Sequence, residues 1–171
     1  MKNNTIITIS REYGSGGRII GKQLAEKLGI PFYDNELITL AAERSGINEE
    51  YFKEAETMAK SSIILSLSML SPATEVYGMP LNEKIFLTQS KVIREVAEEG
   101  PCVIVGRCAD FVLQNNPNVI NIFIHSSLPN RVKRVKEVYG DVSHDNVEAI
   151  IKKVDTRRAN YYSYFTDRAW G

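Results

Sequence analysis

Residues 5–18, TIITISREYGSGGR, decide the fold of this chain. Their first part, Thr5 to Ile9, is short and rich in β-branched residues, which predicts a buried strand of a parallel sheet. The strand breaks into a glycine loop, and apolar residues then recur at helical spacing from Ile19 to Leu28. The stretch therefore predicts a strand, a loop and a helix in succession.

Apolar and periodic segments alternate along the rest of the chain. They predict strands at 102–105 and 119–124, and helices at 37–44, 49–60, 84–99, 109–113, 130–138 and 145–160. This order indicates an α/β three-layer domain with a mostly parallel sheet, whose ligands bind beyond the carboxyl ends of the strands. Residues 61–81, with two X-Pro pairs, are interpreted as a mobile helical insertion.

Composition excludes several classes of function. The 171 residues include 21 Lys+Arg and 21 Asp+Glu, so the formal net charge is zero, and no block of one sign suits a nucleic acid polymer or a membrane. The polar N-terminus and the short apolar tracts argue against export and membrane insertion. The two cysteines, Cys102 and Cys108, predict neither a disulfide framework nor a metal site. We expect one cytoplasmic domain, 1–171, that binds a small molecule.

The glycine loop is a candidate phosphate site. A loop from a strand into a helix aims backbone N–H groups and the positive end of the helix dipole at one point. Gly14, Ser15, Gly16 and Gly17 allow the backbone to fold closely around a phosphate, and Arg18 adds a permanent positive charge. A tight turn without a ligand is the alternative. A Rossmann dinucleotide site is set aside, because its last glycine would fall at Ile19.

The loop departs from the G-x-x-x-x-G-K-[ST] pattern of a regular phosphate loop. In one register Arg11 stands at the first glycine, Gly17 at the lysine and Arg18 at the Ser/Thr. In the other register Arg18 stands at the lysine and Ile19 at the hydroxyl that binds magnesium. The sequence therefore does not identify the metal ligands.

Four stretches together resemble the cytidylate kinase-like family of P-loop proteins. Residues 9–18 are similar to its start, 24–34 to its first helix and second strand, 102–110 to its central strand and following turn, and 153–162 to the helix after its lid. The resemblance covers essentially the whole chain in the family's order. It implies a nucleoside monophosphate kinase fold with a five-stranded parallel sheet.

The resemblance also implies activity and segment roles. Mg²⁺ with ATP is the expected donor, and a nucleoside monophosphate, first of all CMP or dCMP, is the expected acceptor. Residues of about 35–85 are expected to form an acceptor-binding helical insertion, and about 136–150 a lid. Relatives continue into one more strand and helix beyond Gly171, which this chain is expected to lack.

Arginines dominate the candidate site residues, because phosphoryl transfer requires charge neutralisation more than covalent chemistry. Arg18 is predicted to contact the β and γ oxygens of ATP, and Arg107, just past a strand end, to bind the acceptor monophosphate. Arg157 and Arg158 are predicted to act catalytically from the lid side. For any one of these arginines, a solvated surface position is the alternative.

The remaining candidates are assigned to the acceptor. Arg131 and Arg134 precede the lid, and Asp34 follows the second strand. Asp110 is predicted to orient Arg107 or Mg²⁺. The aspartates have a simpler alternative, which is to lie at helix starts.

Two other functions remain open. The missing lysine and Ser/Thr allow a nucleotide-binding regulator with the same fold and little or no turnover. The same enzyme class with a different small acceptor is the other possibility, because few residues of 61–81 have a defensible role in reading a base.

Overall fold

The computed structural model describes residues 4–34, 37, 40, 44, 75–76, 79–138 and 146–171. The chain forms two compact units, one of Met1–Asp34 with Val96–Gly171 and one of Asn35–Glu95. The predicted helix at 49–60 lies outside the described residues, as do most of the helix at 37–44, most of the insertion and lid positions 139–145.

The first unit is built on a parallel sheet. Its strands lie in the order β2-β5-β1-β6, with the bounds Ile6–Arg11 for β1, Phe32–Tyr33 for β2, Cys102–Val105 for β5 and Val119–Ile124 for β6. The register pairs Ile9 with Val105, and Arg11 with Ile124, so the carboxyl ends of the strands share one edge. The prediction of a parallel α/β sheet is confirmed, and the described residues contribute four of the five strands that the resemblance implied.

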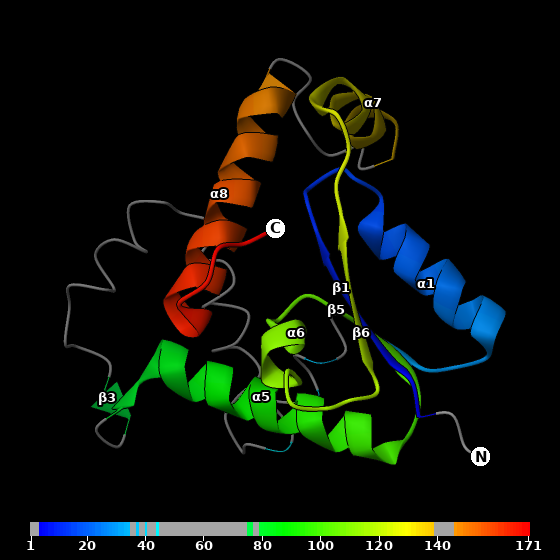
Figure 1. Cartoon of the computed structure of the whole chain (residues 1–171). Coiled ribbons are helices and arrows are strands. Elements are labelled where there is room, and N and C mark those ends of the chain that lie inside the picture. Colours follow the sequence, from blue (N-terminus) through cyan, green and yellow to red (C-terminus); the bar gives the residue numbers. More distant parts are fainter. Residues whose placement is uncertain are drawn as a thin grey trace. The chain divides into compact units, whose positions relative to one another are not determined.

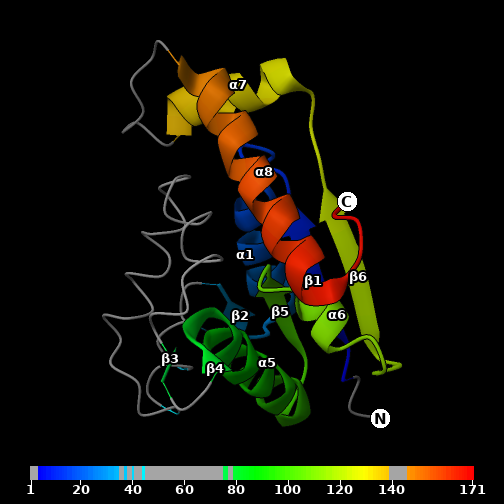
Figure 2. The ribbon, with the colours of Figure 1, turned by 90° about the vertical axis from the view of Figure 1, so that its left-hand side faces the viewer.

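Helices cover both faces of this sheet, as Figures 1 and 2 show. Helix α1 (Gly17–Leu28) lies on one face, and α6 (Ala109–Val112) and α8 (Val147–Thr166) lie on the other. A Cβ at Gly21 would stand only 3.0 Å from Ile9 Cδ1, so this glycine allows α1 to approach the sheet closely. Ile9, Val103 and Val105 are fully buried there. The expected three layers are present.

Helix α7 (Leu128–Val138) packs against α8 at the carboxyl edge of the sheet. A small core of Val135, Val147 and Ile151 joins the two helices, and Tyr13 of the glycine loop packs against it. Helix α8 runs to Thr166 rather than ending at Asn160 as predicted. Its aromatic final turns remain helical until Asp167, which adopts a left-handed conformation with φ of 55°.

The second unit holds a short antiparallel ribbon. Strands β3 (Glu75–Val76) and β4 (Met79–Pro80) pair Val76 with Met79. These four residues correct the helical expectation for 61–81, since an extended residue before Pro80 is favoured over a helical one. Helix α5 (Leu81–Glu99) begins directly after Pro80, three residues earlier than predicted. Among the described residues, no helix has both the length and the apolar character needed to cross a membrane.

Candidate active site

The phosphate loop joins the last residue of β1, Arg11, to the first residue of α1, Gly17. Gly14 and Gly16 have φ of 78° and 90°, a region that other residues enter only with strain. A Cβ at Gly14 would lie 2.9 Å from Val135 Cγ2, and one at Gly17 would lie 2.6 Å from the Arg11 Cβ. The backbone conformation therefore requires glycine at positions 14 and 16. Close packing requires it at positions 14 and 17.

The start of α1 has the character of an anion site. Gly16, at the N-cap, provides no capping side chain, and the first turn contains no acidic residue. The first N–H groups of a helix have no acceptor within the helix, and the helix dipole is positive there. Arg18 in the same turn adds a cation. A phosphate would satisfy these donors.

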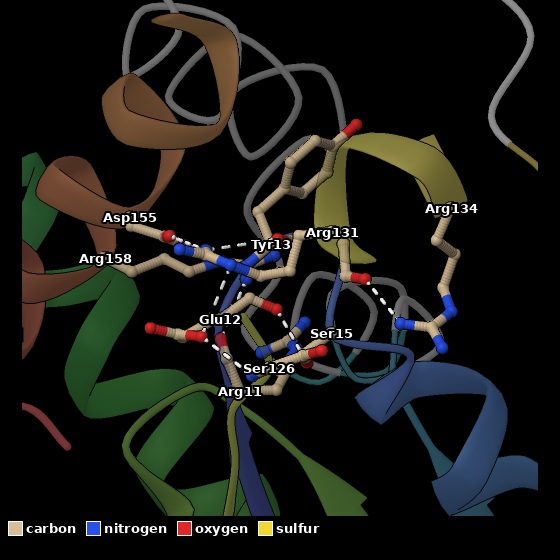
Figure 3. A network of polar contacts seen from close by, with 10 residues as sticks. Arg11, Glu12, Tyr13, Ser15, Ser126, Arg131, Arg134, Asp155 and Arg158 are labelled. Carbon is tan, nitrogen blue, oxygen red and sulfur yellow. Dashed lines mark hydrogen bonds and ion pairs between the residues drawn. The ribbon is translucent and has the colours of Figure 1, made fainter. Parts of the chain in front are cut away.

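Three arginines from α7 and α8 hold the carbonyls of the loop (Figure 3). Arg158 Nη1 donates to the oxygen of Arg11 at 2.8 Å, and Arg134 Nη1 to that of Gly14 at 2.9 Å. Arg131 Nη1 donates to the oxygen of Tyr13 at 3.3 Å. Arg131, Arg134 and Arg158, predicted for the acceptor and for catalysis, thus converge on the donor loop.

Two carboxylates complete this network. Asp155 Oδ1 accepts the N–H of Tyr13 at 2.7 Å, and its Oδ2 accepts from Arg131 Nη1. Glu12 Oε2 accepts the N–H of Ser126 at 3.0 Å and lies 3.4 Å from Arg131 Nε. The loop therefore carries balancing negative charge beside its arginines.

Ser15 is buried and faces the loop itself. Its hydroxyl donates to the carbonyl of Glu12 at 2.9 Å, and its N–H reaches the same oxygen at 3.3 Å. These bonds close a tight turn over Glu12 to Ser15. Ser15 thus shapes the loop in this structure.

The surroundings of Arg158 lower its pKa. Burial, then the nearby charge of Arg11, lowers its pKa from the ordinary 12.5 to about 10, against the opposing effect of Asp155. The neighbouring Arg157 lowers it further. The Arg158 guanidinium nevertheless stays protonated at neutral pH.

Asp34 connects two arginines at the carboxyl edge. Its Oδ2 accepts from Arg18 Nε, and its Oδ1 lies 3.7 Å from Arg11 Nη2. The Asp34 side chain is 10% exposed, whereas that of Arg18 is 57% exposed. The predicted donor cation and the predicted acceptor residue are therefore paired with each other.

Arg107 lies in an unusual turn directly after β5. Gly106, Arg107 and Cys108 have φ of 79°, 57° and 54° in succession. A left-handed conformation costs a residue with a side chain about 1–2 kcal/mol, and such strain is often kept at functional sites. The turn follows a strand end at the same edge as the phosphate loop. Arg107 also lies near Tyr161. Burial raises the pKa of Tyr161, and the positive charge of Arg107 lowers it in part.

Asp110 is engaged by α8. Its Oδ2 accepts the hydroxyl of Tyr162 at 2.6 Å, and burial together with this bond raises the pKa of Tyr162. Asp110 lies in the first turn of α6, the simpler alternative considered for it. Its proposed link to Arg107 or Mg²⁺ stays a prediction.

The described residues offer little for a metal ion on their own. No group of three or more His, Cys, Asp or Glu side chains in this part of the chain could hold one. Mg²⁺ commonly binds through one or two carboxylates together with substrate phosphates. At this edge the two oxygens of Asp34 already face Arg18 and Arg11, so the phosphates would supply most ligands of a metal ion.

Sequence reasoning missed several residues of the network, namely Arg11, Glu12, Tyr13, Ser126 and Asp155. Arg11 and Ser126 could have been found from the predicted strands. Arg11 ends β1 and Ser126 follows β6, both at the ligand-binding edge of the parallel sheet. Asp155 had only a weak signal, its place three residues before Arg158 on one helix face.

The chain is similar to known proteins over nearly its whole length. The cytidylate kinase-like family matches residues 6–171. An uncharacterized protein from Eubacterium ventriosum is 31% identical, with a TM-score of 0.69 over 98% of this chain and 81% of that chain. A gluconokinase from Sinorhizobium meliloti is 12% identical, with a TM-score of 0.45 over 98% of this chain and 96% of that chain. No curated protein matches.

The family match has a direct consequence for the fold and the activity class. It spans nearly the whole chain, including the phosphate loop and α8. The predicted P-loop kinase fold is confirmed by it, together with the parallel sheet. This protein belongs to the cytidylate kinase-like family.

Proposed function

We propose that the protein transfers the γ-phosphoryl group of ATP to a nucleoside monophosphate, with CMP or dCMP as the preferred acceptor. The observation that carries the proposal is the start of α1, which has no capping side chain, no acidic residue in its first turn and a cation at Arg18. Together with family membership, this supports a phosphate-binding role for the loop.

The donor is held by the loop of Gly14, Ser15, Gly16 and Gly17. Arg18 takes the place of the usual lysine and contacts the β and γ oxygens once it separates from Asp34. Mg²⁺ would bind together with the donor phosphates, and it would supply positive charge that balances the charge developing during transfer.

The acceptor lies on the side of Arg107 and Asp34, with Asp110 in support, whereas Arg131 and Arg134 contact the donor loop. Arg107 is a planar cation in a strained turn at the ligand-binding edge, which suits recognition of a monophosphate. Arg157 and Arg158 act from α8 by stabilising the transferring group. We place this activity in the cytoplasm, with no membrane or nucleic acid polymer as partner.

The direct test is turnover with defined acceptors. The protein is incubated with Mg-ATP and each of CMP, dCMP, UMP, AMP and GMP, and ADP release is measured against a sample without acceptor. ADP formed with cytidine nucleotides supports the proposal. ATP binding by calorimetry without turnover on any acceptor would instead indicate a regulator or an acceptor outside the nucleotides.

A further inference from the structure

We propose that Asp155 of α8 is a positioning residue for the donor phosphates, because it fixes the backbone of the phosphate loop at Tyr13. The inference rests on the proposed kinase function and extends it to a residue outside the sequence motifs of the loop. Asp155 and Tyr13 are 142 positions apart in the sequence.

Both backbone polar groups of Tyr13 are held by one ion pair. Asp155 Oδ1 accepts the Tyr13 N–H at 2.7 Å, and Arg131 Nη1 donates to the Tyr13 oxygen at 3.3 Å. The same Nη1 also donates to Asp155 Oδ2. Helices α7 and α8 thereby clamp the residue that precedes Gly14 (Figure 3).

This clamp determines the direction of the next amide. In a trans peptide the C=O and the following N–H point in opposite directions. The Tyr13 oxygen points to Arg131, so the N–H of Gly14 points away from Arg131. Asp155 keeps Arg131 in place and thus holds the Gly14 N–H ready for a phosphate oxygen.

Charge alone predicts the opposite effect of Asp155. A carboxylate beside an anion site repels ATP, so its removal would tighten ATP binding if only Coulomb forces acted. The side chains of Asp155 and Arg131 are 17% and 11% exposed, so solvent screens them only in part. A positioning role predicts weaker ATP binding when Asp155 is removed. The sign of the change therefore separates the two explanations.

The experiment compares Asp155→Leu and Asp155→Asn with wild type. Asp155→Leu loses both contacts, whereas Asp155→Asn keeps an acceptor for the Tyr13 N–H and loses the ion pair. We expect ATP binding, measured by calorimetry, to weaken about tenfold in Asp155→Leu and about threefold in Asp155→Asn. The KM for the acceptor should stay within about twofold, whereas a general distortion of the site would weaken the binding of both substrates.

Two further measurements complete the test. Hydrogen exchange at the Tyr13 amide should be faster in Asp155→Leu than in wild type. Glu26→Gln is the control, because Glu26 is an exposed carboxylate in the last turn of α1, outside the site and the expected lid, and it should bind ATP as wild type does.

The outcomes remain distinguishable. Unchanged or tighter ATP binding in Asp155→Leu overturns the positioning role and leaves the proposed function standing. If Asp155→Leu does not fold, the same result in Asp155→Asn has the same meaning. A wild-type protein that binds no ATP overturns the proposed function, and the donor role of Asp155 with it.

Discussion

Arg158 Nη1 donates a hydrogen bond to the backbone oxygen of Arg11, 2.8 Å away, and thus joins α8 to the last residue of β1. Helix α8 follows the segment expected to form the lid, and β1 leads into the phosphate loop. The bond therefore connects the helix after the expected lid directly to the loop.

The Arg158 contact predicts a loss of turnover when it is removed. Arg158→Met keeps a side chain of similar length but removes both the charge and the bond to Arg11. Steady-state ADP release should fall by about 10²-fold, the size of effect seen when one charge-stabilising donor is lost. Lys152→Met, on an exposed part of the same helix, should retain wild-type turnover. Wild-type turnover in Arg158→Met would show that Arg158 is not required.

Two glycines with positive φ, Gly29 at the end of α1 and Gly14 in the loop, predict different losses of stability on substitution. Gly29 has φ of 64° and open space around it, so Gly29→Ala should cost about 1 kcal/mol through backbone strain alone. Gly14→Ala adds a clash with Val135 and should cost about 2–5 kcal/mol. Urea unfolding measures both values. Equal costs at the two positions would contradict the close packing of α7 on the loop.

Arg18 and Arg107 predict kinetic changes for different substrates. Arg18→Ala should raise the KM for ATP about tenfold or more and lower turnover, whereas Arg107→Ala should mainly raise the KM for the acceptor. Asp34 keeps Arg11 as a partner at 3.7 Å in Arg18→Ala, so no buried carboxylate is left unpaired. Lys22→Ala, also on α1 and exposed, is the control. The same change in both KM values for the two arginine variants would sink the assignment of donor and acceptor sides.

The sequence predicted those parts of the protein that depend on local pattern. The strand, glycine loop and helix of residues 6–28 were predicted correctly, because β-branched runs, glycines and helical spacing are all short-range signals. The extent of α8 was not, because an aromatic run such as 161–165 carries no clear stop signal before Asp167.

Partners in the candidate site were harder to predict than its members. Arg18 and Asp34 were both selected, yet their ion pair depends on how β2 lies beside β5, which spacing along the chain does not reveal. The contact of Asp155 with Tyr13 likewise joins opposite ends of the sequence. The arrangement of the strands, rather than residue type, determines these pairs.

The buried cysteines predict how stability depends on pH. Burial raises the pKa of Cys102 to about 11, with a smaller contribution from Glu99, and raises the pKa of Cys108 to about 12, from an ordinary value of 9.0. Between pH 9 and these values the unfolded thiols lose protons that the folded thiols retain. The contribution of both thiols to the free energy of unfolding is thus complete below pH 9. It is lost as pH rises toward 11 and 12.

This pH dependence can be isolated with a double variant. Wild type and Cys102→Ala/Cys108→Ala are unfolded with urea at pH 8 and pH 10, and the change in unfolding free energy between the two pH values is compared. Wild type should lose more stability than the variant, because the tyrosines with raised pKa values, Tyr161 and Tyr162, are common to both proteins. The same loss in both proteins would mean that the two thiols ionise as readily in the folded state as in the unfolded one.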